Sequence, residues 1–264
     1  MAAARVYDNE LPAVATTATT PDLSAISPWV FRVISSDSAN GLTIARFVSD
    51  LGVQSVAILY ENNSYGRGLV EAFRRGYSGR IITVDPIPDD ADASFEPYIS
   101  WIRSRSPDLV FVAGTVGSGI AILREARRQR LRSAFIGGDG WTGIVADTAA
   151  SEGTYVAAPF SPEDPRAAAR RFVASFRERY GVEPDGNAAL AYDATMLLAR
   201  AISEVGPSRT KVRDWLAGLT SATAFAGVTG PIYFDLQGDV VGKEVVMTRV
   251  RRGELTVDRP GSGS

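Results

Sequence analysis

Short apolar runs alternate with segments of helical periodicity through most of the chain. The apolar runs are rich in Val, Ile and Ala and predict strands, at 11–15, 55–60, 80–85, 108–114, 134–138 and 154–159. Between these runs, apolar residues recur at helical spacing and predict helices, at 39–52, 65–77, 94–106 and 117–131. Strands that alternate with helices are typical of a parallel sheet with helices on its faces, so we expect an α/β fold.

From residue 163 to residue 219 the periodicity is helical throughout, and helices are expected at 163–181, 186–206 and 208–219. A Gly-Asp turn at 238–239 and an apolar run at 243–250 then predict a return to strand. This order is expected when a chain leaves one lobe, builds a second, goes back and crosses again. We therefore predict two lobes.

The composition is that of an ordinary globular protein. Hydrophobic residues make up 45% of the 264 residues and charged residues 22%. No apolar run approaches the length of about 20 residues that spans a bilayer. The net charge is −2 and the pI is near 5.4, so the chain has no basic patch of the kind that binds nucleic acid, and we expect no nucleic-acid partner.

Two residue types are absent. Without His, the chain has no Ser-His-Asp or Cys-His catalysis and lacks the commonest zinc ligand. Without Cys, it has neither thiol chemistry nor disulfides. The acidic run at 89–92 lacks the ligand spacing of a calcium loop and reads as a solvated turn. We therefore expect no catalytic residues, no cofactor and no metal.

The glycines of "FIGGDGWTG" (135–143) have the G-x-G-x-x-G spacing of a loop that cradles a dinucleotide. That loop should follow the first strand of a βαβ unit and enter a long helix. Here it follows the fifth predicted strand, and the next segment is short and weakly amphipathic. Two other interpretations are open: Asp139 is a turn residue, or it is a ligand contact placed in the middle of the loop.

Three other strand ends carry candidate ligand contacts. The segment 15–24 has five hydroxyl side chains, which suit either a carboxylate ligand or a helix N-cap. Tyr65 follows the second strand and either covers a ligand or packs at the start of a helix. The small residues of 112–119 would let a ligand approach the backbone. The ends of parallel strands are where α/β folds bind ligands.

Taken in order, these segments resemble the leucine/isoleucine/valine-binding protein family, the type I periplasmic substrate-binding proteins of ABC transporters. The resemblance extends from about residue 4 to about residue 258. Its most specific parts are an Ala-Thr-x-Pro loop, a Phe-Arg-x-x-x-x-Asp segment, a Tyr-Gly-x-Gly loop and a Tyr-Asp-Ala helix, at 18–21, 31–37, 65–68 and 192–194.

The resemblance implies a type I periplasmic-binding-protein fold, with two Rossmann-like lobes joined by three crossovers. The crossovers are expected near 31–38, 144–154 and 225–233. Lobe 1 would hold 1–34 and 150–228, lobe 2 would hold 35–149 and 229–258, and 259–264 would be a linker-like tail. The chain starts on what resembles the end of a helix, and the family's first βα units have no counterpart, so lobe 1 is expected to be incomplete.

The resemblance also implies a ligand site between the lobes. Thr17, Ala18 and Thr19 match the loop that binds the ligand carboxylate and part of its ammonium. Tyr65, Thr115 and Asp139 match the contacts from lobe 2, with Asp139 paired to the ammonium. Many family members that select aliphatic ligands carry an aromatic residue at the position of Thr115.

Three further side chains complete the expectations for the site. Trp141 is expected to wall the pocket. Two other acids near strand ends, Glu61 and Asp193, are expected to face solvent.

The implied function is that of an extracytoplasmic solute-binding protein, which delivers an amino acid or related amphipathic solute to an ABC transporter by hinge closure. The implied location is periplasmic or extracytoplasmic, although the chain shows no signal peptide. The expected partners are the ligand, the membrane subunits of the transporter and, through the incomplete lobe, a second copy. Two alternatives are a ligand-sensing domain of a receptor or regulator with the same fold, and a nucleotide-dependent enzyme built on the glycine loop.

Overall fold

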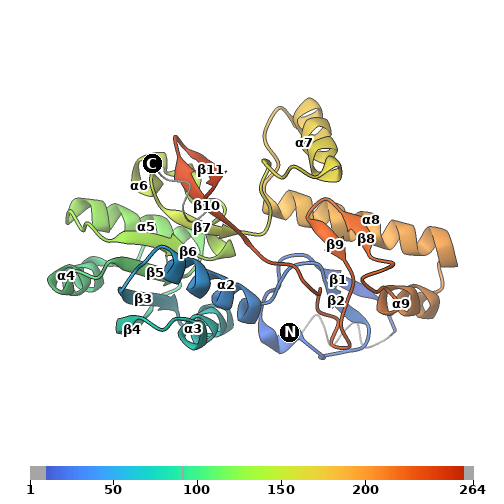
Figure 1. The fold of residues 1–264 in the computed structure, drawn as a ribbon, viewed down its shortest axis with the longest axis horizontal. Helices are drawn as coiled ribbons and strands as arrows, with labels where there is room; N and C mark the ends of the chain where they lie inside the picture. The colour runs from blue at the N-terminus through green and yellow to red at the C-terminus, as the bar shows by residue number, and fades with distance from the viewer. Residues whose placement is uncertain (1–9, 91, 259–264) are drawn as a thin grey trace. The chain divides into compact units, whose positions relative to one another are not determined.

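The computed structural model describes residues 10–90 and 92–258 (Figure 1). They form two units. Unit 1 contains the chain up to Ser36 and then Pro162–Glu244, and unit 2 contains Asp37–Ser161 and the chain from Val245 onwards. The chain therefore passes three times between the units, after Ser36, after Ser161 and after Glu244.

Unit 2 is built on a seven-stranded sheet with the order β11-β10-β7-β6-β5-β3-β4. The strands β3 to β7 are parallel, and β10 and β11 are antiparallel additions at one edge. Their bounds are β3 Ser55–Glu61, β4 Arg80–Ile87, β5 Leu109–Ala113, β6 Ala134–Gly137, β7 Tyr155–Ala158, β10 Val246–Arg251 and β11 Glu254–Val257.

The central strand β3 explains why the sequence shows a continuous apolar run there. Val56 and Ile58 point into one hydrophobic cluster, and Ala57 and Leu59 point into another on the opposite face. Successive side chains of a strand alternate between faces, so a strand covered on both faces has no polar positions to alternate with. The sheet of unit 2 is therefore buried on both sides.

Helices cover the two faces of this sheet (Figure 1). The helices α2 (Asp37–Asp50) and α3 (Ser64–Gly76) contribute to the first cluster, and α4 (Glu96–Arg105) and α5 (Val116–Arg128) contribute to the second. Three short helical turns follow β6: η2 (Asp139–Trp141), η3 (Ile144–Ala146) and α6 (Thr148–Ser151).

The described part of unit 1 has two small two-stranded sheets, one short 3-10 helix and three α-helices. The parallel pair is β1 (Ala13–Ala15) with β2 (Val30–Arg32), and the antiparallel pair is β8 (Phe225–Gly227) with β9 (Gly230–Ile232). The short helix η1 (Pro21–Leu23) follows β1, and the helices α7 (Ala167–Tyr180), α8 (Gly186–Val205) and α9 (Arg209–Ala217) form most of the rest.

The larger hydrophobic cluster of unit 1 lies against α8. Leu190, Ala194, Leu197 and Ala201 recur at helical spacing along α8 and are buried there with residues from β2, α9 and β9. The side chain of Asp185 caps the helix by accepting a hydrogen bond from the amide of Ala188 at 2.7 Å.

The predicted strands and helices are present, with ends shifted by a few residues. Two parts differ. Residues 150–161 stay with unit 2, because β7 pairs with β6 and β10, and residues 229–244 stay with unit 1, where β9 pairs with β8. The expectations for the first nine residues and for the tail 259–264 lie outside the described residues. None of the helices described is long and apolar enough to cross a membrane.

Candidate functional site

Three polar residues that follow or end neighbouring strands lie together at one edge of the sheet of unit 2. Glu61 ends β3, Thr115 follows β5 and Asp139 follows β6, and these strands are parallel neighbours around β5. Tyr65 lies in the first turn of α3, directly after β3. Because the carboxyl ends of parallel strands share one edge, the chain brings these side chains together from segments far apart in sequence.

Tyr65 and Asp139 form the polar centre of this edge. The Tyr65 hydroxyl donates a hydrogen bond to Oδ1 of Asp139 at 3.2 Å, and the amide of Gly140 donates to the Tyr65 hydroxyl oxygen at 3.1 Å. Burial raises the pKa of Asp139 to about 6, although a backbone hydrogen bond and the bond from Tyr65 favour the ionised form. Burial and the nearby carboxylate of Asp139 raise the pKa of Tyr65 well above its ordinary value.

The glycines of the 135–143 loop make room for this tyrosine. A Cβ at residue 138 would lie 2.6 Å from the Tyr65 hydroxyl, and one at residue 140 would lie 2.8 Å from the carbonyl oxygen of Gly114. The loop then enters the three-residue helix η2, and not the long helix that a dinucleotide-binding loop requires. The G-x-G spacing therefore serves the packing of Tyr65 beside Asp139.

Glu61 is fully buried, so the expectation that it faces solvent is wrong. Its Oε1 accepts hydrogen bonds from the amide of Thr115 at 2.8 Å and from the hydroxyls of Thr115 and Ser118, each at 2.7 Å. Its Oε2 accepts from Asn63 at 3.2 Å. Thr115 itself is exposed, but both of its donors are used by Glu61. Toward a ligand, Thr115 therefore offers a methyl group and oxygen lone pairs.

Trp141 lies in the core beneath the loop. It is fully buried in the cluster that α4 and α5 line. A Cβ at residue 119 would lie 2.6 Å from its Nε1, and one at residue 137 would lie 2.1 Å from its ring. In this structure Trp141 therefore supports the Asp139 loop from below and presents no surface to solvent.

The hydroxyl-rich loop of unit 1 follows β1. Thr17 is exposed, Ala18 is half-buried and Thr19 is 5% exposed. The hydroxyl oxygen of Thr20 accepts a hydrogen bond from the amide of Asp22 at 3.4 Å, at the start of η1. The helix-capping interpretation of this segment thus applies to Thr20, while Thr17 and Ala18 remain accessible.

Asp193 is fully buried in unit 1, so the expectation that it faces solvent is also wrong. Its carboxylate accepts hydrogen bonds from the amides of Val228 at 2.6 Å and Thr229 at 2.8 Å, and from the Thr229 hydroxyl. Lys243 Nζ donates to the same hydroxyl oxygen at 2.5 Å and to the carbonyl oxygen of Val33 at 2.6 Å. Burial lowers the pKa of Lys243 to about 8, a shift that the charge of Asp193 opposes.

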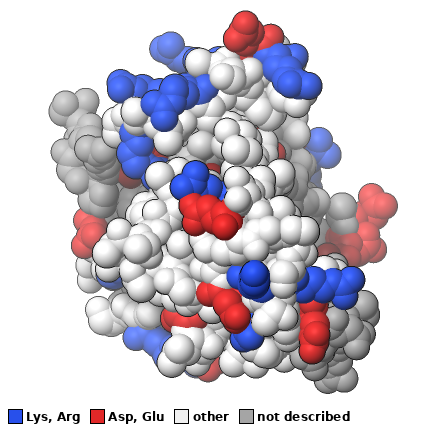
Figure 2. All heavy atoms as spheres, turned by 90° about the vertical axis from the view of Figure 1, so that its right-hand side faces the viewer, with Lys and Arg blue, Asp and Glu red and all other residues white. Residues whose placement is uncertain are grey.

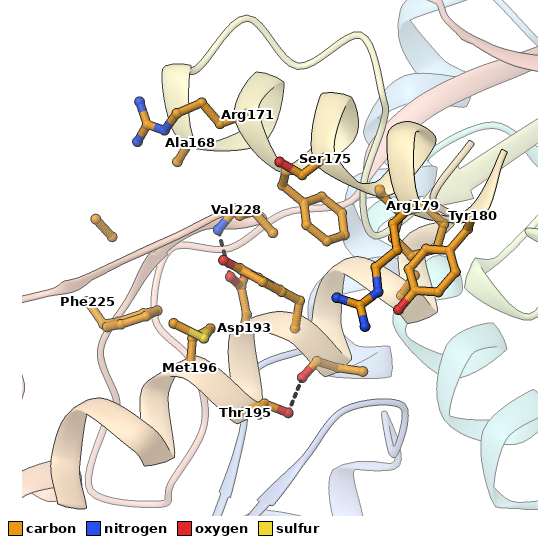
Figure 3. A pocket seen from close by; sticks show the side chains of 16 residues that line it. Ala168, Arg171, Ser175, Arg179, Tyr180, Asp193, Thr195, Met196, Phe225 and Val228 are labelled. Carbon is orange, nitrogen blue, oxygen red and sulfur yellow. Dashed lines mark hydrogen bonds between the residues drawn. The ribbon is translucent and has the colours of Figure 1, made fainter. Parts of the chain in front are cut away.

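Unit 1 also has an open groove of about 690 Å³ between α7, α8 and β8 (Figure 3). Phe172 and Tyr192 are in contact across it, with ring centroids 4.9 Å apart. Tyr180 and Met196, on its two sides, are 59% and 41% exposed. Figure 3 shows the Asp193 carboxylate turned to the amide of Val228, so this acid is already satisfied. The groove is therefore mainly an apolar surface.

Several charged side chains elsewhere are paired with an opposite charge. Figure 2 shows acidic and basic groups interspersed among uncharged ones on the face it presents. Two arginines of the basic run in α5 are paired: Arg124 with Asp147 at 2.6 Å and Arg128 with Glu125 at 2.6 Å. Within residues 10–90 and 92–258, no three acidic side chains gather as metal ligands.

The family described as "Periplasmic binding protein" matches residues 1–254 of this chain. A Leu/Ile/Val-binding protein homolog of Brucella abortus is 27% identical over 259 residues, which are 94% of this chain and 67% of the relative. The chain thus spans about two thirds of that relative's length.

Solved structures show the same fold. A leucine-binding protein from Thermotoga maritima is 27% identical with a TM-score of 0.89, covering 97% of this chain and 75% of its own. A solute-binding protein of an ABC transporter from R. palustris, in complex with benzoate, has a TM-score of 0.87 at 20% identity, over 97% of this chain and 73% of its own, and so supports the fold alone.

Proposed function

We propose that this chain, which belongs to the periplasmic binding protein family, binds an α-amino acid that has an apolar side chain. In this proposal the α-ammonium of the amino acid pairs with Asp139. The family consists of binding proteins and not of enzymes, which agrees with the expectation of no catalysis drawn from the missing His and Cys. The observation that supports the proposal is the half-buried carboxylate of Asp139 at the strand-end edge of unit 2.

The electrostatics of this edge favour a ligand with a positive charge. Burial raises the pKa of Asp139, and no basic group in the described chain contributes to its shift. Glu61 and Asp37 add negative charge in the same unit, the first beneath Thr115 and the second close enough to act on Tyr65. A carboxylate in partly buried surroundings is stabilised by an opposite charge, and a ligand ammonium supplies one.

The same argument separates amino acids from simple aromatic acids. The T. maritima protein is a leucine-binding protein, and the R. palustris protein holds benzoate, which has a carboxylate and no ammonium. A benzoate placed beside Asp139 would meet a like charge and would gain nothing from this side chain. The amino acid is therefore the ligand that this edge favours.

The other expected contacts remain proposals. Thr17, Ala18 and Thr19 are proposed to bind the ligand carboxylate, and Thr115 is proposed to contact the ligand side chain through its methyl group. Trp141 was expected to wall the pocket; because it is fully buried, we propose instead that it supports the Asp139 loop from the core side. The methyl of Thr115 fits an apolar side chain, because both of its hydrogen-bond donors are used by Glu61.

The wider role is also proposed. In this role the protein is periplasmic or extracytoplasmic, and ligand-driven hinge closure presents it to the membrane subunits of an ABC transporter. A ligand-sensing domain of a receptor is the alternative, since the same fold serves both roles.

Self-association through the apolar groove of unit 1 is proposed as well. Several large apolar side chains are exposed on α8 and around the end of α7, a pattern that marks interaction surfaces. They are Tyr180, Val182, Tyr192 and Met196.

Binding is tested by a thermal-shift panel on the chain 1–264. The panel contains the apolar amino acids, their amides, and aromatic acids that lack an amine. The proposal expects stabilisation by amino acids and none by benzoate. Stabilisation by benzoate and not by any amino acid would contradict it.

A further inference from the structure

Arg32 is a buried arginine in the strand β2 of unit 1. Its side chain is 1% exposed. Burying a guanidinium away from water is strongly unfavourable unless hydrogen bonds and an opposite charge replace the lost hydration. The partners of Arg32 therefore show what this buried charge is used for.

All of these partners lie in the loop after β1 and in one turn near the end of unit 1. Nη1 donates to the carbonyl oxygens of Thr19 at 3.0 Å and Thr20 at 2.9 Å. Nη2 donates to Oγ of Ser24 at 2.7 Å and to Oδ2 of Asp239 at 2.7 Å. Two terminal nitrogens carry four N–H bonds, and each of the four has an acceptor.

Asp239 supplies the counter-charge and is itself held in place. Its Oδ2 also accepts a hydrogen bond from the Ser24 hydroxyl at 2.8 Å, and its amide donates to Oδ1 of Asp235 at 3.0 Å. The planar guanidinium thus joins the loop to the 235–239 turn in a fixed geometry, which a lysine ammonium cannot reproduce.

This arrangement sets the direction of the loop's peptide groups. The peptide bonds of the described chain are all trans. In a trans peptide the N–H and the C=O point in opposite directions. The carbonyl of Thr19 faces Arg32, so the amide of Thr20, in the same peptide group, points away from Arg32. Donors of this kind, together with the threonine hydroxyls, suit a carboxylate. Arg32 has no terminal N–H left for the ligand.

We propose that Arg32 is a positioning residue for recognition of the ligand carboxylate: its guanidinium, paired with Asp239, holds the carbonyls of Thr19 and Thr20 inward, which turns the amide of Thr20 outward and fixes the backbone of the 17–20 loop. The peptide after Thr20 adds no donor, because residue 21 is a proline. Recognition then uses neutral donors in a fixed loop, and not a direct ion pair with arginine. The functional part rests on the proposed amino-acid binding.

The test combines a change of one residue in the protein with a change of one group in the ligand. Leucine and leucinamide share an ammonium and a side chain, but only leucine has a carboxylate. Isothermal titration calorimetry of both ligands is compared for wild type, Arg32→Lys and the surface control Arg200→Lys in the same unit. Arg32→Lys is expected to weaken the binding of leucine at least about tenfold and the binding of leucinamide less than about twofold. A structural defect alone would weaken both ligands equally, and that result would overturn the proposal.

A second variant and a ligand-free measurement cover the case in which Arg32→Lys folds poorly. Asp239→Asn removes the counter-charge at constant shape and should show the same selective loss for leucine. Hydrogen exchange of either variant should accelerate at the amides of Leu23, Ser24 and Ala25, with α8 unchanged. Unchanged exchange in this loop overturns the loop-holding role. Failure of wild type to bind any amino acid overturns the proposed function and the role in recognition together, while the exchange data still decide the loop-holding role.

Discussion

The hydroxyl of Tyr65 lies 3.2 Å from a carboxylate oxygen of Asp139, although the two residues are 74 positions apart in sequence. The contact exists because α3 starts directly after β3, and β3 and β6 flank β5 in the sheet of unit 2. Asp139 is thereby held by one neutral hydroxyl and by the backbone, in surroundings that raise its pKa to about 6. A ligand ammonium at this carboxylate must therefore compete with a proton.

Ligand affinity should consequently depend on pH. Well above pH 6 the Asp139 carboxyl of the free protein is mostly ionised, and well below pH 6 it is mostly protonated and cannot pair with an ammonium. We expect leucine affinity to be constant above about pH 7 and to fall towards tenfold per unit as the pH drops below 6. Calorimetric titration from pH 5 to pH 8 measures this. An affinity that is unchanged across that range would contradict the role of Asp139.

Lys243 predicts a different pH effect, on stability. Burial lowers its pKa from the ordinary 10.5 to about 8 in the folded protein. Between pH 8 and pH 10.5 the unfolded chain holds the proton that the folded chain has released, so the contribution of Lys243 to stability rises with pH across this window. Lys243→Met should remove that rise in urea unfolding experiments.

The chain contains a matched control, because its other lysine, Lys211, is exposed. Lys211→Met should leave the pH dependence of stability unchanged. Equal slopes for wild type and Lys243→Met between pH 8 and pH 10.5 would show that Lys243 is not buried as described.

Glu61 should be important for the stability of unit 2. Glu61→Ala removes the acceptor that the amide and hydroxyl of Thr115 share with the hydroxyl of Ser118, and Ser118 alone keeps a second acceptor, the carbonyl oxygen of Thr115 at 3.2 Å. A hydrogen bond to a carboxylate contributes about 1.5–3 kcal/mol, so we expect a loss of at least about 2 kcal/mol in the free energy of unfolding. The control Glu71→Ala removes an exposed side chain and should change it by less than about 1 kcal/mol. Similar losses for the two variants would argue against the buried network.

The groove of unit 1 predicts association between copies. Tyr192 lines the groove and is 43% exposed, while Ile202, on the same helix, is 47% exposed but does not line it. A charge in the groove should weaken apolar association, so Tyr192→Lys is expected to shift sedimentation velocity profiles towards monomer. Ile202→Lys is the control and should shift them less. A strictly monomeric wild type at all concentrations would refute self-association.

The sequence predicted the sheet of unit 2 well because its signal is local. Runs such as Val56–Tyr60 are apolar at every position, since both faces of the sheet are covered. It also placed Tyr65, Thr115 and Asp139 at strand ends, and parallel strands bring such ends to one edge.

The burial of two acids could not be predicted in this way. Glu61 is buried because Thr115 and Ser118, 54 and 57 residues away, supply hydroxyls and an amide. Asp193 is buried because the amides of Val228 and Thr229 reach it from another segment. Burial of a charged side chain depends on partners that only the tertiary structure brings near, so periodicity gives no sign of it.

The central claim is that Asp139 pairs with a ligand ammonium, and a direct test compares two ligands that differ only in that group. Leucine and 4-methylpentanoate share a carboxylate and a branched side chain, but only leucine has an amine. In calorimetric titrations of the chain 1–264 at pH 7.5, leucine should bind and 4-methylpentanoate should not. Asp139→Asn should weaken leucine binding by about 3 kcal/mol or more. The control Asp50→Asn, at an exposed acid, should leave leucine binding unchanged. Tight binding of 4-methylpentanoate, with leucine binding unchanged in Asp139→Asn, would contradict the account.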